Sequence, residues 1–241
     1  MEAADPKSGE CGSCKTGDSI LTRDIFDFWA EVAPGDRTHP KDRDVLARID
    51  HGFNLECLPS GFSGPLRSTP VVLLYLSPGF KPQDVVEANT LEGKTRYVGM
   101  RTGLQALPGP EDFYPAWKWW ESRTKIFGPW THLRDKIALL NLGGYHSENV
   151  KNPNMLLSLP SYQVAKNWAK DILFPQAEQG DRVVVCMRSV RLWGFDSKPR
   201  RYGKALFVPK FTRSGHMHKT GEHADMRNEV IAAVKAAIGY P

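Results

Sequence analysis

Four short apolar runs place the strongest constraint on how this 241-residue chain can fold. Residues 69–77 (TPVVLLYLS) and 136–142 (KIALLNL) are continuous apolar stretches, followed by Pro-Gly and Gly-Gly respectively. Residues 182–187 (RVVVCM) and 204–208 (KALFV) are runs of the same kind. Apolar runs without polar alternation are typical of parallel strands that are buried on both faces. We therefore predict four strands, in this order along the chain, that pair in parallel.

Segments with helical periodicity lie before, between and after these strands. The predicted helices cover residues 19–32, 40–49, about 115–125, about 161–174 and 222–238, with a short helix after the third strand. Pro175 and Gly239 are expected to end the last two long helices, and residues 51–69 to form a loop. This order predicts an α/β fold: a single three-layer α/β/α domain over residues 18–241 with a central four-stranded parallel sheet. Residues 1–17 are expected to be a flexible N-terminal tail.

The composition excludes several classes of protein. Apolar residues make up 41% of the chain and charged residues 24%, which is typical of a globular protein rather than a disordered one. No apolar run approaches the ~20 residues of a membrane span, and no secretory signal is recognisable, so we expect a cytoplasmic protein with no membrane contact. Cys11 and Cys14 form a lone CxxC, short of the roughly four ligands of a zinc site, so no metal is predicted.

The positive charge is concentrated in one part of the chain. The whole chain carries a net charge of +5, but residues 181–219 contain ten basic and two acidic side chains, a net +8. The remaining residues therefore sum to −3. A basic segment of this density is typical of a face that binds phosphate groups, although a solubilising surface has the same composition.

In sheets of this type ligands bind at the carboxyl ends of the strands, so the candidate site lies in the segments that follow them. Those segments are Tyr75–Phe80, Asn141–His146, Arg188–Trp193 and Pro209–His218. The first is neither a GxGxxG nor a GK[ST] phosphate loop, and Ser77 lacks the glycines of a nucleophile elbow. The Asn141 amide presents a donor and an acceptor side by side, a geometry that can bind the edge of a nucleobase.

In their order and placement these segments resemble the uracil-DNA glycosylase superfamily, over roughly residues 60–240. The stretch Leu74–Gly79 (LYLSPG) looks like the Gly-Ile-Asn-Pro-Gly of its mismatch-specific members. The stretch Ala138–Asn141 (ALLN) looks like the Leu-Leu-Asn with which the uracil-specific members bind the base. Pro209–His218 takes the place of the His-Pro-Ser loop that grips the DNA backbone.

The chain departs from the pattern of this family at three points. Ser77 stands where the family has its catalytic Asp or Asn, and Tyr75 stands where a Gly is usual. The last loop lacks the His-Pro-Ser order, and His216 is its best match to the family's histidine, with Arg213 second. Asp84 resembles the acidic residue that some members carry shortly after the Pro-Gly, and as a plain acid near a helix N-terminus it has a structural explanation as well.

The resemblance implies hydrolysis of the N-glycosidic bond of uracil or other deaminated bases in DNA, as in base excision repair, by a monomer without a cofactor. The catalytic candidates are Ser77 or Asp84, which would hold the attacking water, and His216, which would stabilise the leaving base. The residues expected to contact the base are Leu76, Gly79, Phe80 and Asn141. The residues expected to contact the DNA backbone are Arg188, Lys210, Arg213 and Ser214.

Gly79 has an implication for specificity under this resemblance. The uracil-specific members have a Tyr at this position, which crowds the C5 edge of the base and excludes thymine. Because Gly79 has no side chain, we expect a broad range of bases. The candidates for stacking on an extruded base are Phe80, Tyr97, Phe113 and Trp117.

Three other interpretations stay open at this stage. A catalytically weak or inactive member of the same fold would bind nucleic acid only, and Ser77 in the catalytic position favours it. An unrelated α/β hydrolase that processes nucleotides would use the basic segment equally well. A structural or interaction protein with a basic face is the third.

Overall fold

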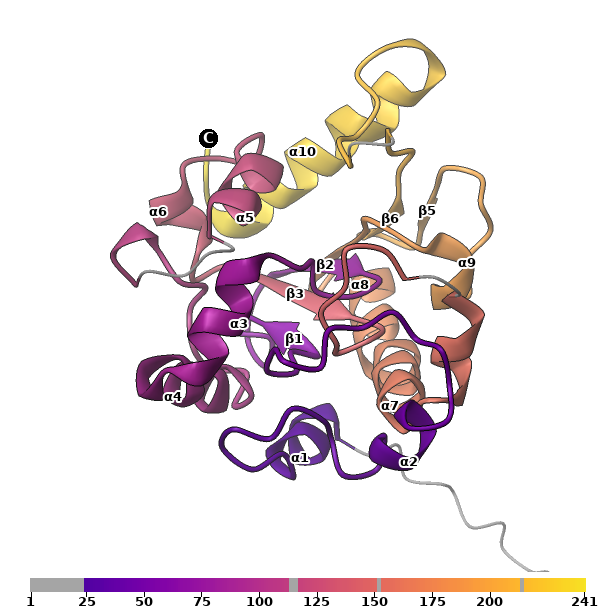
Figure 1. Cartoon of the computed structure of the whole chain (residues 1–241). Coiled ribbons are helices and arrows are strands. Elements are labelled where there is room, and N and C mark those ends of the chain that lie inside the picture. The colour runs from indigo at the N-terminus through magenta and orange to yellow at the C-terminus, as the bar shows by residue number, and fades with distance from the viewer. Residues whose placement is uncertain (1–23, 113–116, 151–152, 213–214) are drawn as a thin grey trace, which may run out of the picture.

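A computed structural model describes residues 24–112, 117–150, 153–212 and 215–241. Its six strands form one mixed sheet in the order β1-β3-β2-β4-β6-β5 (Figure 1). The strands are β1 (Phe62–Ser63), β2 (Val71–Tyr75), β3 (Ile137–Asn141), β4 (Val183–Cys186), β5 (Arg200–Tyr202) and β6 (Leu206–Val208). β3, β2, β4 and β6 are parallel, as predicted, whereas β1 and β5 pair antiparallel at the two edges. The four predicted strands are therefore confirmed as the parallel core of the sheet, whereas the prediction of a four-stranded sheet is wrong because it missed the two edge strands.

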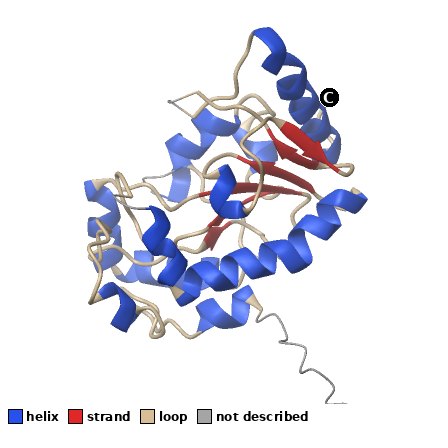
Figure 2. Ribbon diagram, turned by 90° about the vertical axis from the view of Figure 1, so that its right-hand side faces the viewer, coloured by secondary structure: helices blue, strands red, loops and turns tan. Residues whose placement is uncertain are grey.

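The helices cover both faces of this sheet (Figures 1 and 2). They are α1 (Ile25–Ala30), α2 (Arg43–Leu46), α3 (Pro82–Asn89), α4 (Leu91–Met100), α5 (Trp117–Thr124), α6 (Trp130–Leu133), α7 (Pro160–Trp168), α8 (Phe174–Gln179), α9 (Val190–Trp193) and α10 (Ala224–Ile238). Alternate residues of β2 divide between the two layers, because successive side chains of a strand point to opposite faces. Val72 and Leu74 pack in the layer of α1, α7 and α8, and Val71 and Leu73 in the layer of α4, α6 and α10. None of the helices in the described ranges is long and apolar enough to cross a bilayer.

The segment predicted as one helix over 161–174 is longer than expected and changes its winding. α7 passes into a π-helical turn, Ala169–Leu173, which leads directly into α8. Pro175 therefore lies inside the helical segment and does not end it, contrary to the prediction. A proline has no N–H and its ring clashes with the carbonyl four residues earlier in a regular α-helix. The π turn, in which the hydrogen bonds span five residues, lies directly before Pro175 in the chain.

Other boundaries also differ from the sequence-based expectation. Residues 51–69, expected to be a loop, contain the short strand β1, and the stretch after β2 folds into the two short helices α3 and α4. The last helix begins with a 3₁₀ turn, Gly221–His223, before α10. Gly239 ends α10 in the left-handed conformation, with φ of 66°, as predicted. The predicted tail, residues 1–17, lies outside the described residues.

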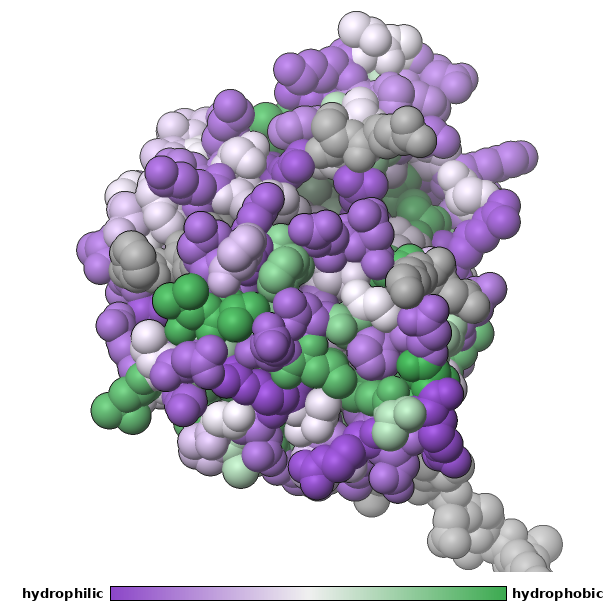
Figure 3. All heavy atoms as spheres, viewed as in Figure 1, coloured by the Kyte–Doolittle hydropathy of each residue, from purple (hydrophilic) through white to green (hydrophobic). Residues whose placement is uncertain are grey.

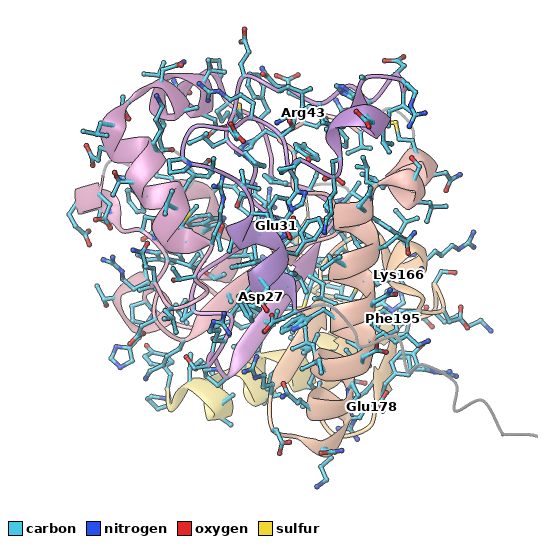
Figure 4. All side chains as sticks on the ribbon, turned by 90° about the horizontal axis from the view of Figure 1, so that it is seen from below. Asp27, Glu31, Arg43, Lys166, Glu178 and Phe195 are labelled. Atoms are coloured by element: carbon cyan, nitrogen blue, oxygen red, sulfur yellow. The ribbon has the colours of Figure 1, made fainter. Side chains whose placement is uncertain are left out.

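A buried carboxylate ties the N-terminal segment to the sheet layer above it. Asp42 is fully buried, and its Oδ2 accepts a hydrogen bond from the Tyr145 hydroxyl at 2.6 Å, while Oδ1 accepts one from the backbone N–H of Ser161 at 3.0 Å. Seen from below, α1, which carries Asp27 and is followed by Glu31, lies beside α7 (Figure 4). Asp42 therefore joins three segments that are far apart in the sequence.

We expect Tyr145→Phe to lower the free energy of unfolding by about 1.5–3 kcal/mol, because it removes one donor from a buried charged acceptor. Urea unfolding measures this loss. Tyr202→Phe is the matched control, since the Tyr202 hydroxyl only accepts a long contact of 3.4 Å from the exposed Asp196 N–H. If both variants lost the same free energy of unfolding, the hydrogen bond from Tyr145 to Asp42 would not contribute to stability.

Candidate functional site

A cleft of about 980 Å³ opens at the carboxyl ends of the parallel strands. The segments after three of these strands contribute to its wall, together with α3 and α5. The lining residues are Tyr75–Lys81 at and beyond the end of β2, Asn141 and His146–Val150 at and beyond the end of β3, Arg188 and Ser189 after β4, Asp84 on α3, and Trp119, Trp120 and Arg123 on α5, together with Ser60, Ser63 and Leu139. Of the residues predicted from the sequence, the cleft brings together Leu76, Ser77, Gly79, Phe80, Asp84, Asn141 and Arg188.

The loop after β2 is held by the loop after β3. The carbonyl of Leu76 accepts a hydrogen bond from Gly143 N–H at 2.7 Å, and the carbonyl of Pro78 accepts one from Ser147 N–H at 3.2 Å. Ser77 lies between these two anchored residues and is half-buried in the cleft wall. The backbone around Ser77 is therefore fixed from the neighbouring strand end.

Asn141 occupies the last position of β3, opposite Tyr75 in the register with β2. Its side chain is 6% exposed, and Nδ2 donates a hydrogen bond to the Ser60 carbonyl at 3.1 Å. Since the carbonyl accepts from Nδ2, this contact fixes which end of the amide is the donor. Within the described residues, Oδ1 has no hydrogen-bond partner, and the second Nδ2 hydrogen is also left for a ligand in the cleft.

Asp84 lies at the start of α3, in agreement with its structural explanation from the sequence as an acid near a helix N-terminus. Its Oδ2 accepts a hydrogen bond from Lys81 N–H at 2.6 Å, which holds the first turn of the helix. The same carboxylate is buried in the cleft wall. Asp84 is therefore a helix-capping acid that also faces the site.

His146 is the functional candidate that sequence reasoning did not single out. It is buried, its Nδ1 contacts the Gly79 carbonyl at 2.8 Å, and its Nε2 lies 3.3 Å from the Tyr97 hydroxyl. The Gly79 contact requires an N–H at Nδ1, so Tyr97 donates to Nε2 in the neutral ring. Nδ1 also lies 3.6 Å from Asp84 Oδ2. His146 thus links the Pro-Gly loop to the buried carboxylate, and no local motif marks it.

The aromatic wall of the cleft comes mainly from α5. Trp119 is 41% exposed and meets the Tyr75 ring edge-on, with ring centres 5.3 Å apart. Of the predicted stacking candidates, Phe80 lines the cleft, Tyr97 is buried behind His146, and Trp117 lines a different cavity. Phe113 lies outside the described residues. The exposed face of Trp119 makes it a stronger stacking candidate than any of these.

Two arginines form the cationic side of the cleft. Arg188 follows β4, and Arg123 on α5 lies over the Trp119 ring at 5.4 Å. A Cβ atom added at Gly215 would lie 2.9 Å from a guanidinium nitrogen of Arg188 and 3.2 Å from one of Arg123. The backbone of the last loop therefore packs closely against both arginines. Burial raises the pKa of the Tyr75 hydroxyl. The positive charges of Arg123 and Arg188 partly oppose this rise, because both arginines lie near the Tyr75 side chain.

The remaining predicted residues of the last loop lie outside the cleft lining or outside the described residues. His216 is exposed and next to Gly215, but it does not line the cleft, and Lys210 is exposed as well. Partial desolvation and the neighbouring Arg123 lower the pKa of His216 below its ordinary value. Arg213 and Ser214 belong to the residues that are not described.

Ser189 marks a strained turn at the third strand end. Its φ of 57° and ψ of 41° lie in the left-handed region, and among the described residues it is the one non-glycine with a positive φ. Serine has no special tolerance for this conformation, and such strain concentrates at functional sites. The turn places Ser189 beside Arg188 in the cleft wall.

No metal site emerges from the described part of the chain. In those ranges no three His, Cys, Asp or Glu side chains are grouped closely enough to hold a metal ion. Cys11 and Cys14 lie outside the described residues, and Cys57 and Cys186 are buried free thiols. Comparisons with protein-family models, curated proteins and solved structures give no match to this chain, so any assignment of function depends on the cleft itself.

A second buried carboxylate, Glu87, lies on α3 one turn after Asp84. Burial raises its pKa from 4.5 to about 7, and the paired Arg96 only partly offsets this shift. Between these two pH values the folded protein therefore holds a proton that the unfolded chain releases. The free energy of unfolding must fall as the pH rises through this window.

We expect Glu87→Gln to remove this dependence on pH. Between pH 4.5 and about 7 the wild type should lose up to about 3 kcal/mol of stability relative to the variant, and the difference should stay constant at higher pH. Urea unfolding of both proteins at several pH values measures this. Glu92→Gln removes the exposed partner of Arg96 and is the control that should show a small change. Parallel curves for wild type and Glu87→Gln would contradict the expected titration.

Proposed function

We propose that this protein is a DNA glycosylase of the uracil-DNA glycosylase type, which hydrolyses the bond between the sugar and a deaminated base. One observation carries the proposal: a single cleft gathers the strand-end residues that the family resemblance singled out. Leu76, Ser77, Gly79 and Phe80 come from the first strand end, Asn141 from the second and Arg188 from the third. A cleft of about 980 Å³ has room for an extruded nucleotide.

The amide of Asn141 supplies the recognition of the base. Uracil presents an N3–H donor beside the O4 acceptor, and the free Oδ1 and remaining Nδ2 hydrogen of Asn141 match this pair. Because the Ser60 carbonyl fixes the amide, the match needs no reorganisation when the base arrives. As the glycosidic bond breaks, negative charge develops on the base, and the Nδ2 hydrogen bond to O4 strengthens.

The water that attacks C1′ is assigned to the Ser77 and Asp84 side of the cleft. In the reaction, the water oxygen bonds to C1′, the C1′–N bond breaks, and its electron pair leaves with the base. The water proton passes to the carboxylate of Asp84, and the base takes up a proton from solvent. His146 positions the carboxylate through its 3.6 Å contact and also holds the loop that carries Ser77.

The DNA backbone is assigned to the cationic side of the cleft. Arg188 and Arg123 lie at the carboxyl end of β4 and on α5, and the basic last loop, with Lys210 and His216, adjoins them. Desolvation and, after it, the neighbouring cations lower the pKa of His216, and a phosphate bound on this side would raise it. Under this proposal the base binds beside Asn141 and the phosphate binds beside Arg123 and Arg188.

We expect the protein to leave alkali-labile sites in an oligonucleotide that contains uracil, and Asn141→Ala to reduce that excision about 100-fold or more. The affinity for the same oligonucleotide should stay within about threefold, because the arginines are unchanged. Gel analysis of alkali-treated product and fluorescence anisotropy measure the two quantities. Asn149→Ala is the control, since Asn149 is exposed at the cleft rim.

The competing candidate is a protein that binds nucleic acid without catalysis. Two contacts of Asp84 favour this candidate: Oδ2 accepts the hydrogen bond from Lys81 N–H and lies near His146 Nδ1. This oxygen is therefore already engaged and is less suited to accept a proton from water. Intact uracil, hypoxanthine and xanthine oligonucleotides together with salt-dependent binding would establish this candidate instead. If the protein does not bind DNA at all, both the glycosylase and the non-catalytic DNA-binding protein are excluded.

We expect Gly79→Tyr to narrow the range of bases excised. A Cβ atom at Gly79 would meet no other atom within 4 Å, and the backbone there is not in the left-handed region, so a side chain can be attached without backbone strain. The tyrosine ring would crowd the C5 edge of the base. The ratio of kcat/KM for 5-hydroxymethyluracil to that for uracil should fall at least about 10-fold, while Gly79→Ala keeps it. An unchanged ratio in the tyrosine variant would remove Gly79 from the specificity determinants.

A further inference from the structure

A second group of basic side chains lies outside the cleft, on the segment that links β4 to the edge strand β5. Residues 188–210 contain seven basic side chains and one acidic side chain, Asp196. Arg191, Lys198 and Arg200 are exposed, and in the described part of the chain no carboxylate pairs with them. We call these three residues the basic track. In Figure 3 hydrophilic side chains project from the right-hand margin, where Figure 1 places α9 and β5.

The strand register places the basic track at the edge of the sheet where the cleft opens. Val185 on β4 lies level with Phe207 on β6, and Arg200 on β5 pairs with Val208, the last residue of β6. Because β5 runs antiparallel to β6, its first residue stands at the carboxyl ends of the parallel strands. The segment thus begins at Arg188 in the cleft wall and ends two strand spacings, about 10 Å, further along the same edge.

The two arginines at the start of β5 have different surroundings, because successive side chains of a strand point to opposite faces. Arg201 pairs with Glu229 of α10 at 3.5 Å. Arg200 lies over the ring of Tyr202 at 5.6 Å. Tyr202 in turn packs against Phe195, with ring centres 5.3 Å apart, and both rings are half-buried. Arg200 is therefore held beside an aromatic surface and keeps its charge available to solvent.

These features fit the backbone of a nucleic-acid strand. Exposed arginine and lysine side chains bind phosphate groups, and partly exposed aromatic rings beside them accept stacked bases of any sequence. A row of cations along one edge also matches the regular spacing of charge on a polyanion. At a rise of about 3.4 Å per nucleotide, a strand with one nucleotide in the cleft reaches the far end of this row within about three nucleotides.

We propose that the basic track binds the phosphate backbone of a nucleic-acid strand, up to about three nucleotides away from the nucleotide in the cleft. This inference rests on the part of the proposed function that places nucleic acid in the cleft, and it does not depend on hydrolysis. Arg191, Lys198 and Arg200 contact phosphates, and the Phe195–Tyr202 pair lies beneath the adjoining base.

Fluorescence anisotropy with single-stranded, uracil-centred oligonucleotides of about 3 and about 15 nucleotides tests the proposal. The double variant Lys198→Gln with Arg200→Gln should bind the longer oligonucleotide about 10-fold more weakly near physiological salt. The slope of log affinity against log salt should fall by about 1.4, at about 0.7 for each lost phosphate contact. The shorter oligonucleotide extends too little beyond the cleft to reach the track, so its affinity should stay within about twofold.

The matched control is the double variant Lys170→Gln with Lys204→Gln, which removes the same charge from two exposed side chains. Lys204 lies in the turn before β6, at the opposite edge of the sheet, and Lys170 lies in the π turn between α7 and α8. Both oligonucleotides should bind this variant within about twofold of the wild type, because it changes the overall charge only.

Three results would each overturn the inference: an unchanged salt slope in Lys198→Gln with Arg200→Gln, equal losses in the two double variants, or equal losses for the two oligonucleotides. Alkali treatment of the same samples reports uracil excision separately. Binding that depends on the track without any excision would count against the proposed hydrolysis alone. Excision together with binding that does not depend on the track would count against this inference alone.

Discussion

The pairing of β2 with β3 is the interaction on which the cleft depends. Its parallel register sets Tyr75 opposite Asn141, so the two strands end at the same level and their following loops start side by side. The hydrogen bonds from Gly143 to Leu76 and from Ser147 to Pro78 continue this pairing beyond the strands. A shift of one residue would turn the Asn141 side chain to the other face of the sheet and separate it from the cleft.

The parallel strands and several of the site residues were predictable because both leave a local signal. A buried parallel strand needs a continuous apolar run, and the residues after it line the ligand edge of the sheet. The edge strands left no such signal: β1 has two residues, and β5, Arg200–Tyr202, is mostly exposed and charged. Pro175 was misleading because the π turn that accommodates it depends on how α7 and α8 pack, which local sequence does not reveal.

His146 and Trp119 could not be predicted, for a different reason. The importance of His146 comes from its contacts with Gly79, Tyr97 and Asp84, which are distant from it in the sequence. Trp119 is one of three tryptophans among residues 117–120 in the first turn of α5, and only packing decides which ring is exposed. Residues whose role arises from tertiary contacts have no spacing pattern that identifies them in a single sequence.

Acidic and basic side chains both line the cleft, and their places in the fold bear on how a nucleotide would lie in it. Asp84 faces it from α3, and Arg123 and Arg188 face it from α5 and the end of β4. Under the proposed function, the sugar becomes cationic as the glycosidic bond breaks, and its phosphate stays anionic. The arginines would then hold the phosphate, and the carboxylate would stabilise the sugar carbon. In the sheet, β3 with Asn141 and β4 with the following Arg188 flank β2 on its two sides. Under the proposed function the base and the phosphate of one nucleotide would therefore bind on the two sides of the β2 strand end.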